Sequence, residues 1–285
     1  MALPGGFLLE DFVDRVLAED LGSGGDATSR ATIPAEARFT AEMNCREPIT
    51  VAGLGVAAAF FRQLDRDVRI EQLVEDGQSV PAGTVLMRLQ GNARAMLTAE
   101  RSALNTLQHL SGIATLTRRY ADAIAGTGAT LLDTRKTIPG LRLLDKYATR
   151  MGGAENHRMR LDDGVLIKDN HVGVCGGVAE AVSAAKAANT GLEIQVEVDR
   201  IDQIEPALAA GAERLLLDNM DVSTLEQAVA VVAGRVPLEA SGGVNLDTIR
   251  GIAETGVDYI SVGGITQSAP AVDIGLDYVL QRASG

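Results

Sequence analysis

Residues Ile194–Asn219 read IQVEVDRIDQIEPALAAGAERLLLDN. Two short apolar runs with polar ends, Ile194–Asp199 and Arg214–Asn219, flank a stretch with the apolar spacing of a helix, Ile201–Ala210. A strand, a helix and a second strand in this order form a βαβ unit, in which the two strands lie parallel. The stretch therefore predicts a parallel sheet that is covered by helices.

The same alternation of strands and helices extends in both directions along the chain. Further strands are predicted at Thr130–Lys136, Val165–His171, Pro237–Gly243 and Tyr259–Gly264. Further amphipathic helices are predicted at Leu141–Met151, Val178–Ala188, Val222–Val232 and Leu246–Thr255. Units of this kind, repeated in series, favour a parallel β/α barrel of about six or seven strands over an open sheet. A dinucleotide-binding fold is disfavoured, because no Gly-x-Gly-x-x-Gly follows the first strand.

The chain before residue 105 follows a different order. Short strands are predicted at Phe39–Cys45, Val68–Val74 and Val85–Leu89, with a helix at Leu54–Leu64. Short strands separated by glycine turns indicate a mixed or antiparallel sheet. We therefore expect an α/β chain in three parts. These are a smaller N-terminal α+β sandwich domain at 1–105, a catalytic β/α barrel at 106–272 and a C-terminal helical segment at 273–285.

The composition narrows the class of protein. Apolar residues make up 46% and charged residues 22% of the chain, which is the balance of a globular protein with a large core. The net charge of −12 disfavours a nucleic-acid partner, because nucleic acids bind basic surfaces. No apolar stretch is long enough to span a bilayer, and the first residues do not resemble a signal peptide. We therefore expect a cytoplasmic protein with no membrane partner.

In a β/α barrel the active site forms where the strands end. Glu197 and Asp218 end two neighbouring predicted strands, and carboxylates without Cys or His partners suit Mg²⁺ bound jointly with phosphates. The alternative is that each carboxylate caps the following helix or pairs with a nearby lysine. Gly242–Gly243 and Gly263–Gly264 end the last two strands, where backbone N–H groups can bind phosphate, and plain turns are the alternative there.

Cations are predicted at the same barrel mouth. Arg135, Lys136 and Lys168 end predicted strands, so their side chains should point into the mouth. His157 and Arg158 lie between them in the sequence. A lone histidine is more often structural, but one beside an arginine is a candidate ligand. Arginine forks suit carboxylates and phosphates, so cations clustered in an acidic chain indicate a small anionic substrate.

Longer segments of the chain match a known family. They are Glu100–Asn105 (ERSALN), Ser111–Thr115 (SGIAT), Asp133–Arg142 (DTRKTIPGLR), Gly152–Arg158 (GGAENHR), Leu166–His171 (LIKDNH), Glu239–Gly243 (EASGG) and Ser268–Pro270 (SAP). In this order, and over nearly the whole chain, the sequence resembles the quinolinate phosphoribosyltransferase (decarboxylating) family. Several long motifs in one order are far more specific than any single pattern above.

The resemblance implies a reaction of quinolinate with phosphoribosyl pyrophosphate in NAD biosynthesis, which gives nicotinate mononucleotide, pyrophosphate and CO₂. It implies Mg²⁺ as cofactor at Glu197 and Asp218, and the catalytic residues Lys136, Lys168, Glu197 and Asp218. The implied substrate-binding residues are Arg101, Thr134, Arg135, Lys136, His157, Arg158, Lys168, Glu197, Asp218, Ser241, Gly242, Gly243, Val262, Gly263 and Gly264. It also implies a homodimer or higher homo-oligomer with shared active sites, in which Arg101 reaches the neighbouring subunit's site.

One position departs from the family pattern. Gln267 stands where the family often has a histidine near the 5′-phosphate, which puts the strength of that contact in doubt. Three rival functions differ in what they need. A related phosphoribosyltransferase, or a molybdenum-transport-associated homologue, would act on another aromatic acid, but two groups of cations favour a diacid. A non-catalytic sugar-phosphate binder would not need Glu197 and Asp218, and a Schiff-base aldolase using Lys168 would not need Mg²⁺.

Overall fold

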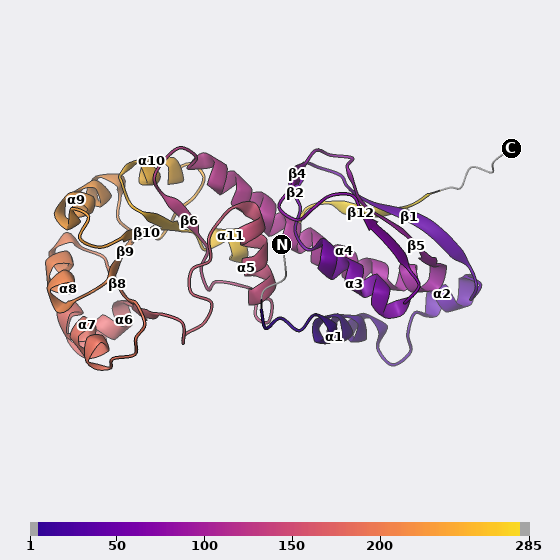
Figure 1. Cartoon of the computed structure of the whole chain (residues 1–285), viewed down its shortest axis with the longest axis horizontal. Coiled ribbons are helices and arrows are strands. Elements are labelled where there is room, and N and C mark those ends of the chain that lie inside the picture. The colour runs from indigo at the N-terminus through magenta and orange to yellow at the C-terminus, as the bar shows by residue number, and fades with distance from the viewer. Residues whose placement is uncertain (1–4, 280–285) are drawn as a thin grey trace. The chain divides into compact units, whose positions relative to one another are not determined.

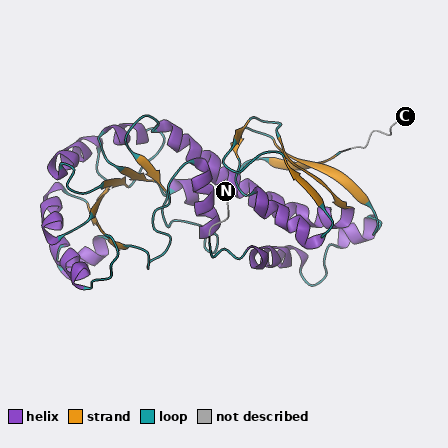
Figure 2. Cartoon of the chain, in the orientation of Figure 1, coloured by secondary structure: helices purple, strands orange, loops and turns teal. Residues whose placement is uncertain are grey.

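A computed structural model describes residues 5–279. The chain folds into two compact units. The first comprises the described residues up to Leu116, the segment Leu143–Gly152 and the described residues from Ala269 onward. The second comprises Thr117–Arg142 and Gly153–Ser268. Each unit has its own sheet, so the two are described separately (Figures 1 and 2).

The second unit contains the parallel sheet. Its strands are β6 (Thr130–Leu132), β7 (Val165–Ile167), β8 (Ile194–Val198), β9 (Arg214–Asp218), β10 (Leu238–Ser241) and β11 (Tyr259–Ser261). They lie in the order β6-β11-β10-β9-β8-β7, and every pair of neighbours is parallel. All of the strands predicted for the barrel are therefore confirmed, although each is shorter than its apolar run.

A further segment extends the sheet past β6. Leu132 and Glu155 form an isolated parallel bridge, supported by the hydrogen bond from the Glu155 N–H to the Leu131 carbonyl at 2.9 Å. No strand is assigned there, because the pairing does not continue along the described chain on either side. The expected α/β fold with a barrel of six or seven strands is thus confirmed as six strands and one bridge.

Helices follow the strands of the second unit, and most of them lie along its outer side (Figure 2). They are α6 (Asp169–Cys175), α7 (Val178–Ala187), the 3-10 turn η1 (Ile201–Gln203), α8 (Ile204–Ala210), α9 (Val222–Val232), α10 (Ile249–Glu254) and α11 (Gly264–Gln267). Figure 1 shows α7, α8, α9 and α10 in succession around the sheet. The outer helices cover one face of the strands, and the other face points into the interior of the unit.

Strand alternation decides which side chains reach that interior. Successive residues of a strand point to opposite faces. Leu215 and Leu217 of β9 are completely buried, whereas Leu216 and Asp218 line a pocket. Neighbouring strands follow the same rule, and the apolar alternate positions anchor the sheet against its helices. Charged side chains can therefore face the pocket while the alternate apolar side chains stay packed against the helices.

The first unit contains an antiparallel sheet in the order β12-β1-β5-β3. Its strands are β1 (Arg38–Cys45), β3 (Arg69–Gln72), β5 (Val85–Asn92) and β12 (Ile274–Tyr278), and β2 (Ile49–Thr50) pairs separately with β4 (Ser79–Val80). The helices are α1 (Leu9–Leu21), α2 (Ala27–Thr32), α3 (Leu54–Leu64), the first part of α4 (Ala93–Ala123) and most of α5 (Arg142–Gly152). Phe60, Phe61 and Met43 are fully buried in its core.

The C-terminal segment requires a correction. The predicted helical segment at 273–285 is wrong for its described part, because Ile274–Tyr278 forms β12 and pairs antiparallel with β1. An ion pair of 2.8 Å between Arg46 and Asp277 adds to this pairing. The edge of β1 offers unpaired backbone groups, which favour an extended partner over an isolated helix. Residues 280–285 lie outside the described part of the chain.

Among residues 5–279, no helix combines the length and the apolar character that crossing a membrane would require.

Candidate active site

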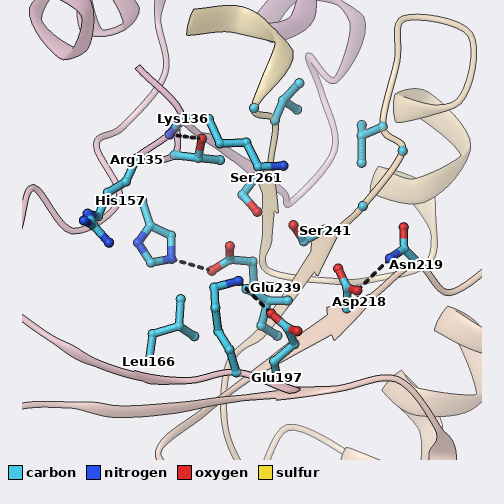
Figure 3. A pocket seen from close by; sticks show the side chains of 18 of the residues that line it. Arg135, Lys136, His157, Leu166, Glu197, Asp218, Asn219, Glu239, Ser241 and Ser261 are labelled. Atoms are coloured by element: carbon cyan, nitrogen blue, oxygen red, sulfur yellow. Dashed lines mark hydrogen bonds and ion pairs between the residues drawn. The ribbon is translucent and has the colours of Figure 1, made fainter. Parts of the chain in front are cut away.

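A pocket of about 830 Å³ lies at the carboxyl ends of the parallel strands of the second unit (Figure 3). The structure brings together there all the site residues that the sequence predicted in this unit. They are Thr134, Arg135, Lys136, His157, Arg158, Lys168, Glu197, Asp218, Ser241, Gly242, Gly243, Val262, Gly263 and Gly264. Gln267 also lines the pocket. Arg101 belongs to the first unit, where it is exposed on α4.

The carboxylates lie on β8 and β9. Lys168 Nζ donates to Glu197 Oε2 at 2.9 Å, and Asn219 Nδ2 donates to Asp218 Oδ2 at 2.6 Å. Glu197 thus pairs with a lysine and lines the pocket at the same time. The cap of α9 is supplied by Asp221, whose Oδ1 accepts from the Thr224 N–H at 2.8 Å. Asp218 is therefore not the helix cap, and its carboxylate remains available to the pocket.

The electrostatics of Asp218 fit a cation site. Burial raises the pKa of the Asp218 carboxyl, and the negative charge of nearby Glu197 raises it further, against the hydrogen bond from Asn219. A pair of carboxylates with incomplete charge compensation attracts a cation. The described residues contain no group of three or more His, Cys, Asp or Glu side chains that could hold a metal on its own. A hard cation would fit here only if water or a bound phosphate completed its oxygen ligands.

Arg135, Lys136 and His157 lie on one side of the pocket, whereas Lys168 pairs with Glu197 on the carboxylate side (Figure 3). Arg158 Nη1 donates to the Gly164 carbonyl at 2.9 Å. Burial lowers the pKa of the Arg158 guanidinium, and the like charge of Arg135 lowers it further. Two guanidinium groups close enough to repel each other indicate a place for an anion between them.

The side chain of Lys136 packs against Gly263. A Cβ atom added at Gly263 would lie 2.8 Å from Lys136 Cδ, so the lysine stem crosses the bare backbone of that residue. The Lys136 N–H donates to Thr134 Oγ1 at 3.0 Å, and Thr266 Oγ1 donates to the Lys136 carbonyl at 2.7 Å. The backbone is thus held at both its polar groups while the side chain reaches the pocket.

The loop after β10 has the properties of an anion cradle. Gly242 has φ +93°, and a Cβ atom there would lie 2.2 Å from Asn219 Oδ1, so only glycine fits. Gly243 has φ +62° and faces open space within 4 Å. Within the described chain, the N–H groups of Gly242, Gly243 and Val244 donate to no acceptor. Unpaired amides beside a pocket favour an anionic ligand.

A buried carboxylate lies between the two sides of the pocket. Glu239 is fully buried on β10, and Figure 3 places it between His157 and Ser241. Its Oε2 atom is 2.7 Å from Arg214 Nη2, and it accepts from Gln195 Nε2 at 2.8 Å. Burial alone would raise the pKa of the Glu239 carboxyl, but His157 and Arg214 lower it to about 2. Glu239 is therefore an ionised group beneath the pocket.

Sequence reasoning assigned no role to several of these residues. Glu239 and Asn219 lay inside motifs or at strand ends, and Leu166 and Ser261 belonged to apolar runs, yet all line the pocket. One signal was present: Gln195, Arg214 and Glu239 are polar positions within otherwise apolar strands. A charge in such a strand needs a partner from another strand.

Comparison with known proteins places the chain in a family. The model of the quinolinate phosphoribosyl transferase C-terminal domain matches residues 113–277, and the model of the N-terminal domain of the same family matches residues 26–111. The chain belongs to the quinolinate phosphoribosyl transferase family. The family that the sequence motifs indicated is thereby confirmed.

Similar proteins cover the quinolinate phosphoribosyl transferase chain nearly end to end. A nicotinate-nucleotide pyrophosphorylase [carboxylating] of Mycobacterium leprae is 46% identical over 94% of this chain and 96% of its own length. A probable nicotinate-nucleotide pyrophosphorylase [carboxylating] of Synechocystis is 40% identical over 97% and 95%. The solved nicotinate-nucleotide pyrophosphorylase of Francisella tularensis has a TM-score of 0.91 at 42% identity, with 95% and 96% covered. Fold and family therefore agree over both units.

Proposed function

We propose that this chain is a quinolinate phosphoribosyltransferase (decarboxylating). It transfers the phosphoribosyl group of phosphoribosyl pyrophosphate to quinolinate and releases pyrophosphate and CO₂, which leaves nicotinate mononucleotide. The observation that carries the proposal is the division of one pocket into a cationic side and a side with carboxylates and a glycine loop. A pyridine diacid fits the first side, and a phosphorylated sugar fits the second.

The diacid is held by the cations. Arg135 and Arg158 are close enough for the charge of one to depress the pKa of the other, and a carboxylate between them relieves that repulsion. The half-buried side chain of Leu166 lines the same pocket and offers an apolar contact for the pyridine ring. A second carboxylate requires a second cation, and Lys136 and Lys168 are the lysines of the pocket.

The phosphoribosyl group is held on the opposite side. The N–H groups of Gly242, Gly243 and Val244, which donate to no acceptor between residues 5 and 279, suit the 5′-phosphate. Glu197 and Asp218 can accept hydrogen bonds from ribose hydroxyls. These two carboxylates would also hold Mg²⁺, which when bound neutralises pyrophosphate charge. Burial and the negative charge of Glu197 raise the pKa of the Asp218 carboxyl, which supports a cation beside these two carboxylates.

The chemistry needs positioning more than a protein nucleophile. The ring nitrogen of quinolinate bonds to C1′ of the ribose as the bond from C1′ to the pyrophosphate oxygen breaks. Positive charge develops on the sugar, and negative charge develops on the leaving group, where Lys136 and Lys168 can stabilise it. The bond between ring carbon and the adjacent carboxylate then breaks, and its electron pair stays on the carbon, beside the positive nitrogen. A solvent proton completes the product.

The active enzyme is proposed to be a homodimer or larger homo-oligomer with shared sites. Arg101 is exposed on α4, and its guanidinium forms no hydrogen bond or ion pair with any residue between 5 and 279. A cation that forms no hydrogen bond or ion pair among the described residues of its own chain can serve a neighbouring copy reciprocally in a symmetric assembly.

One assay tests the function. The chain is incubated with quinolinate and phosphoribosyl pyrophosphate, and both pyrophosphate and CO₂ are measured with and without Mg²⁺. Equal amounts of the two products, dependent on Mg²⁺, are expected. Nicotinate in place of quinolinate is the control, because it has one carboxylate. Pyrophosphate release with nicotinate and none with quinolinate would show that the chain is a phosphoribosyltransferase for a different acid.

A further inference from the structure

A charged group beneath the pocket has no part in the chemistry described so far. The carboxylate of Glu239 is fully buried, and three side chains contact the same oxygen, Oε2. Two of them, Gln195 and Arg214, come from β8 and β9 of the sheet. The third is the His157 ring, whose Nε2 lies 3.3 Å from Oε2. Burying a charge costs free energy, so a position that retains one needs a reason.

The histidine ring connects that carboxylate to the diacid loop. His157 Nδ1 accepts a hydrogen bond from the backbone N–H of Arg158 at 2.8 Å. A backbone N–H can only donate, so Nδ1 carries no proton and the proton of the neutral ring lies on Nε2, where it points to Glu239. Both ring nitrogens are therefore engaged within the chain. His157 was predicted to bind substrate, and this geometry adds that its ring connects Glu239 to the Arg158 backbone.

The loop that His157 begins has a second anchor. The His157 N–H donates to Asp133 Oδ1 at 2.9 Å, and Asp133 is fully buried. Asp133 thus fixes the backbone before the ring, and Glu239 fixes the ring itself. The ring accepts the Arg158 backbone N–H, and the Arg158 guanidinium is one of the cations proposed to bind the diacid.

We propose that Glu239 is a positioning residue that acts through His157. Its carboxylate holds the His157 ring with the proton on Nε2, and the unprotonated Nδ1 holds the backbone of Arg158 in the orientation that binds quinolinate. The inference rests on the proposed function for the identity of the ligand, but the position of the proton does not depend on any ligand. Glu239 itself is not assigned a contact with substrate.

A merely structural role makes a different prediction, and Gln195 separates the two. Gln195 donates to the same oxygen of Glu239 and is also buried, but it does not line the pocket and does not touch His157. If Glu239 only stabilises the sheet, Gln195→Met and Glu239→Gln should lower the stability of the protein to a similar extent. The two variants should then also change ligand affinity to a similar extent. If Glu239 acts through His157, only Glu239→Gln should weaken quinolinate binding.

Calorimetry with a double-mutant cycle is the test in solution. Glu239→Gln should weaken quinolinate binding about tenfold, the equivalent of one charge-assisted hydrogen bond, and leave phosphoribosyl pyrophosphate affinity unchanged. Gln195→Met should change neither affinity. In a His157→Ala background, Glu239→Gln should have little further effect, because the connector is gone. An unchanged affinity in Glu239→Gln, or an equal loss in both backgrounds, would overturn the proposal.

A measurement on the wild-type chain covers the case in which Glu239→Gln does not fold. Nitrogen-15 NMR of histidine-labelled protein distinguishes a ring protonated on Nε2 from one protonated on Nδ1. His157, assigned by comparison with His157→Ala, should carry its proton on Nε2 and none on Nδ1. A proton on Nδ1 would refute the connection. A wild-type chain that binds no quinolinate would contradict the proposed function, while the NMR result would still decide the role of Glu239.

Discussion

Burial lowers the pKa of the Arg158 guanidinium, and the like charge of Arg135 lowers it further. The Arg135 Nε atom is buried and has no hydrogen-bond partner within the described residues. Both observations favour an anionic ligand beside these two arginines. The charges of single residues in this pocket are the basis for two predictions at this scale.

The first concerns Arg135. Arg135→Ala should leave a substrate carboxylate unpaired and weaken quinolinate binding by about 2–5 kcal/mol. Arg160→Ala is the matched control, because Arg160 is exposed, pairs with Asp162 at 2.8 Å and does not line the pocket. Isothermal titration of both variants with quinolinate measures the difference. Near-normal affinity in Arg135→Ala would remove this arginine from the diacid site.

The second concerns the pH dependence of Asp218. Its raised pKa means that the carboxyl takes up a proton at a higher pH than an exposed aspartate does. Binding of Mg²⁺ with phosphoribosyl pyrophosphate needs the carboxylate, so affinity should fall as the pH drops through that raised pKa and recover above it. Asp218→Asn should bind Mg²⁺ and phosphoribosyl pyrophosphate weakly at every pH. Asp199→Asn, at an exposed carboxylate outside the pocket, should keep the wild-type profile, and calorimetry across a pH series decides.

At the scale of elements, the strands were predictable because each is a short apolar run bounded by polar residues, as Ile194–Val198 and Arg214–Asp218 illustrate. Their polar ends also located most of the candidate site. The C-terminal segment was not predictable, because its extended form depends on pairing with β1, which is distant in the sequence. The role of Glu239 was hidden for the same reason: its partners come from other strands.

The glycine loop after β10 provides a prediction for an element. Gly242→Ala adds a Cβ atom 2.2 Å from Asn219 Oδ1, so the loop or Asn219 must move. The variant should lose stability and bind phosphoribosyl pyrophosphate more weakly. Gly243→Ala has a positive φ but meets nothing within 4 Å, so its cost should be near the about 1–2 kcal/mol of the left-handed conformation alone. Denaturant unfolding and calorimetry of both variants compare them. Equal effects would mean that the contact with Asn219 is unimportant.

At the scale of the whole molecule, the proposed oligomer with shared sites is open to a complementation test. Arg101→Ala and Lys136→Ala are each expected to be inactive. If Arg101 serves a neighbouring chain, one site of a mixed dimer collects both changes and the other collects neither. Random exchange should then restore about a quarter of the sites. Mixing that restores nothing, with subunit exchange verified by mass spectrometry, would mean that Arg101 serves its own chain or no site at all.

The position of β12 has a consequence for how the chain is made. β1 occupies Arg38–Cys45, but one of its two partner strands is Ile274–Tyr278. One edge of β1 therefore stays unpaired until synthesis of the chain has reached Tyr278. At typical translation rates the wait is roughly 10–50 s, during which an unpaired edge is open to other chains. A chain ending at Val272 should therefore aggregate and be cleaved near β1 by proteases. A chain ending at Val279, which keeps β12, should resist both, and equal behaviour of the two would contradict this dependence on the last strand.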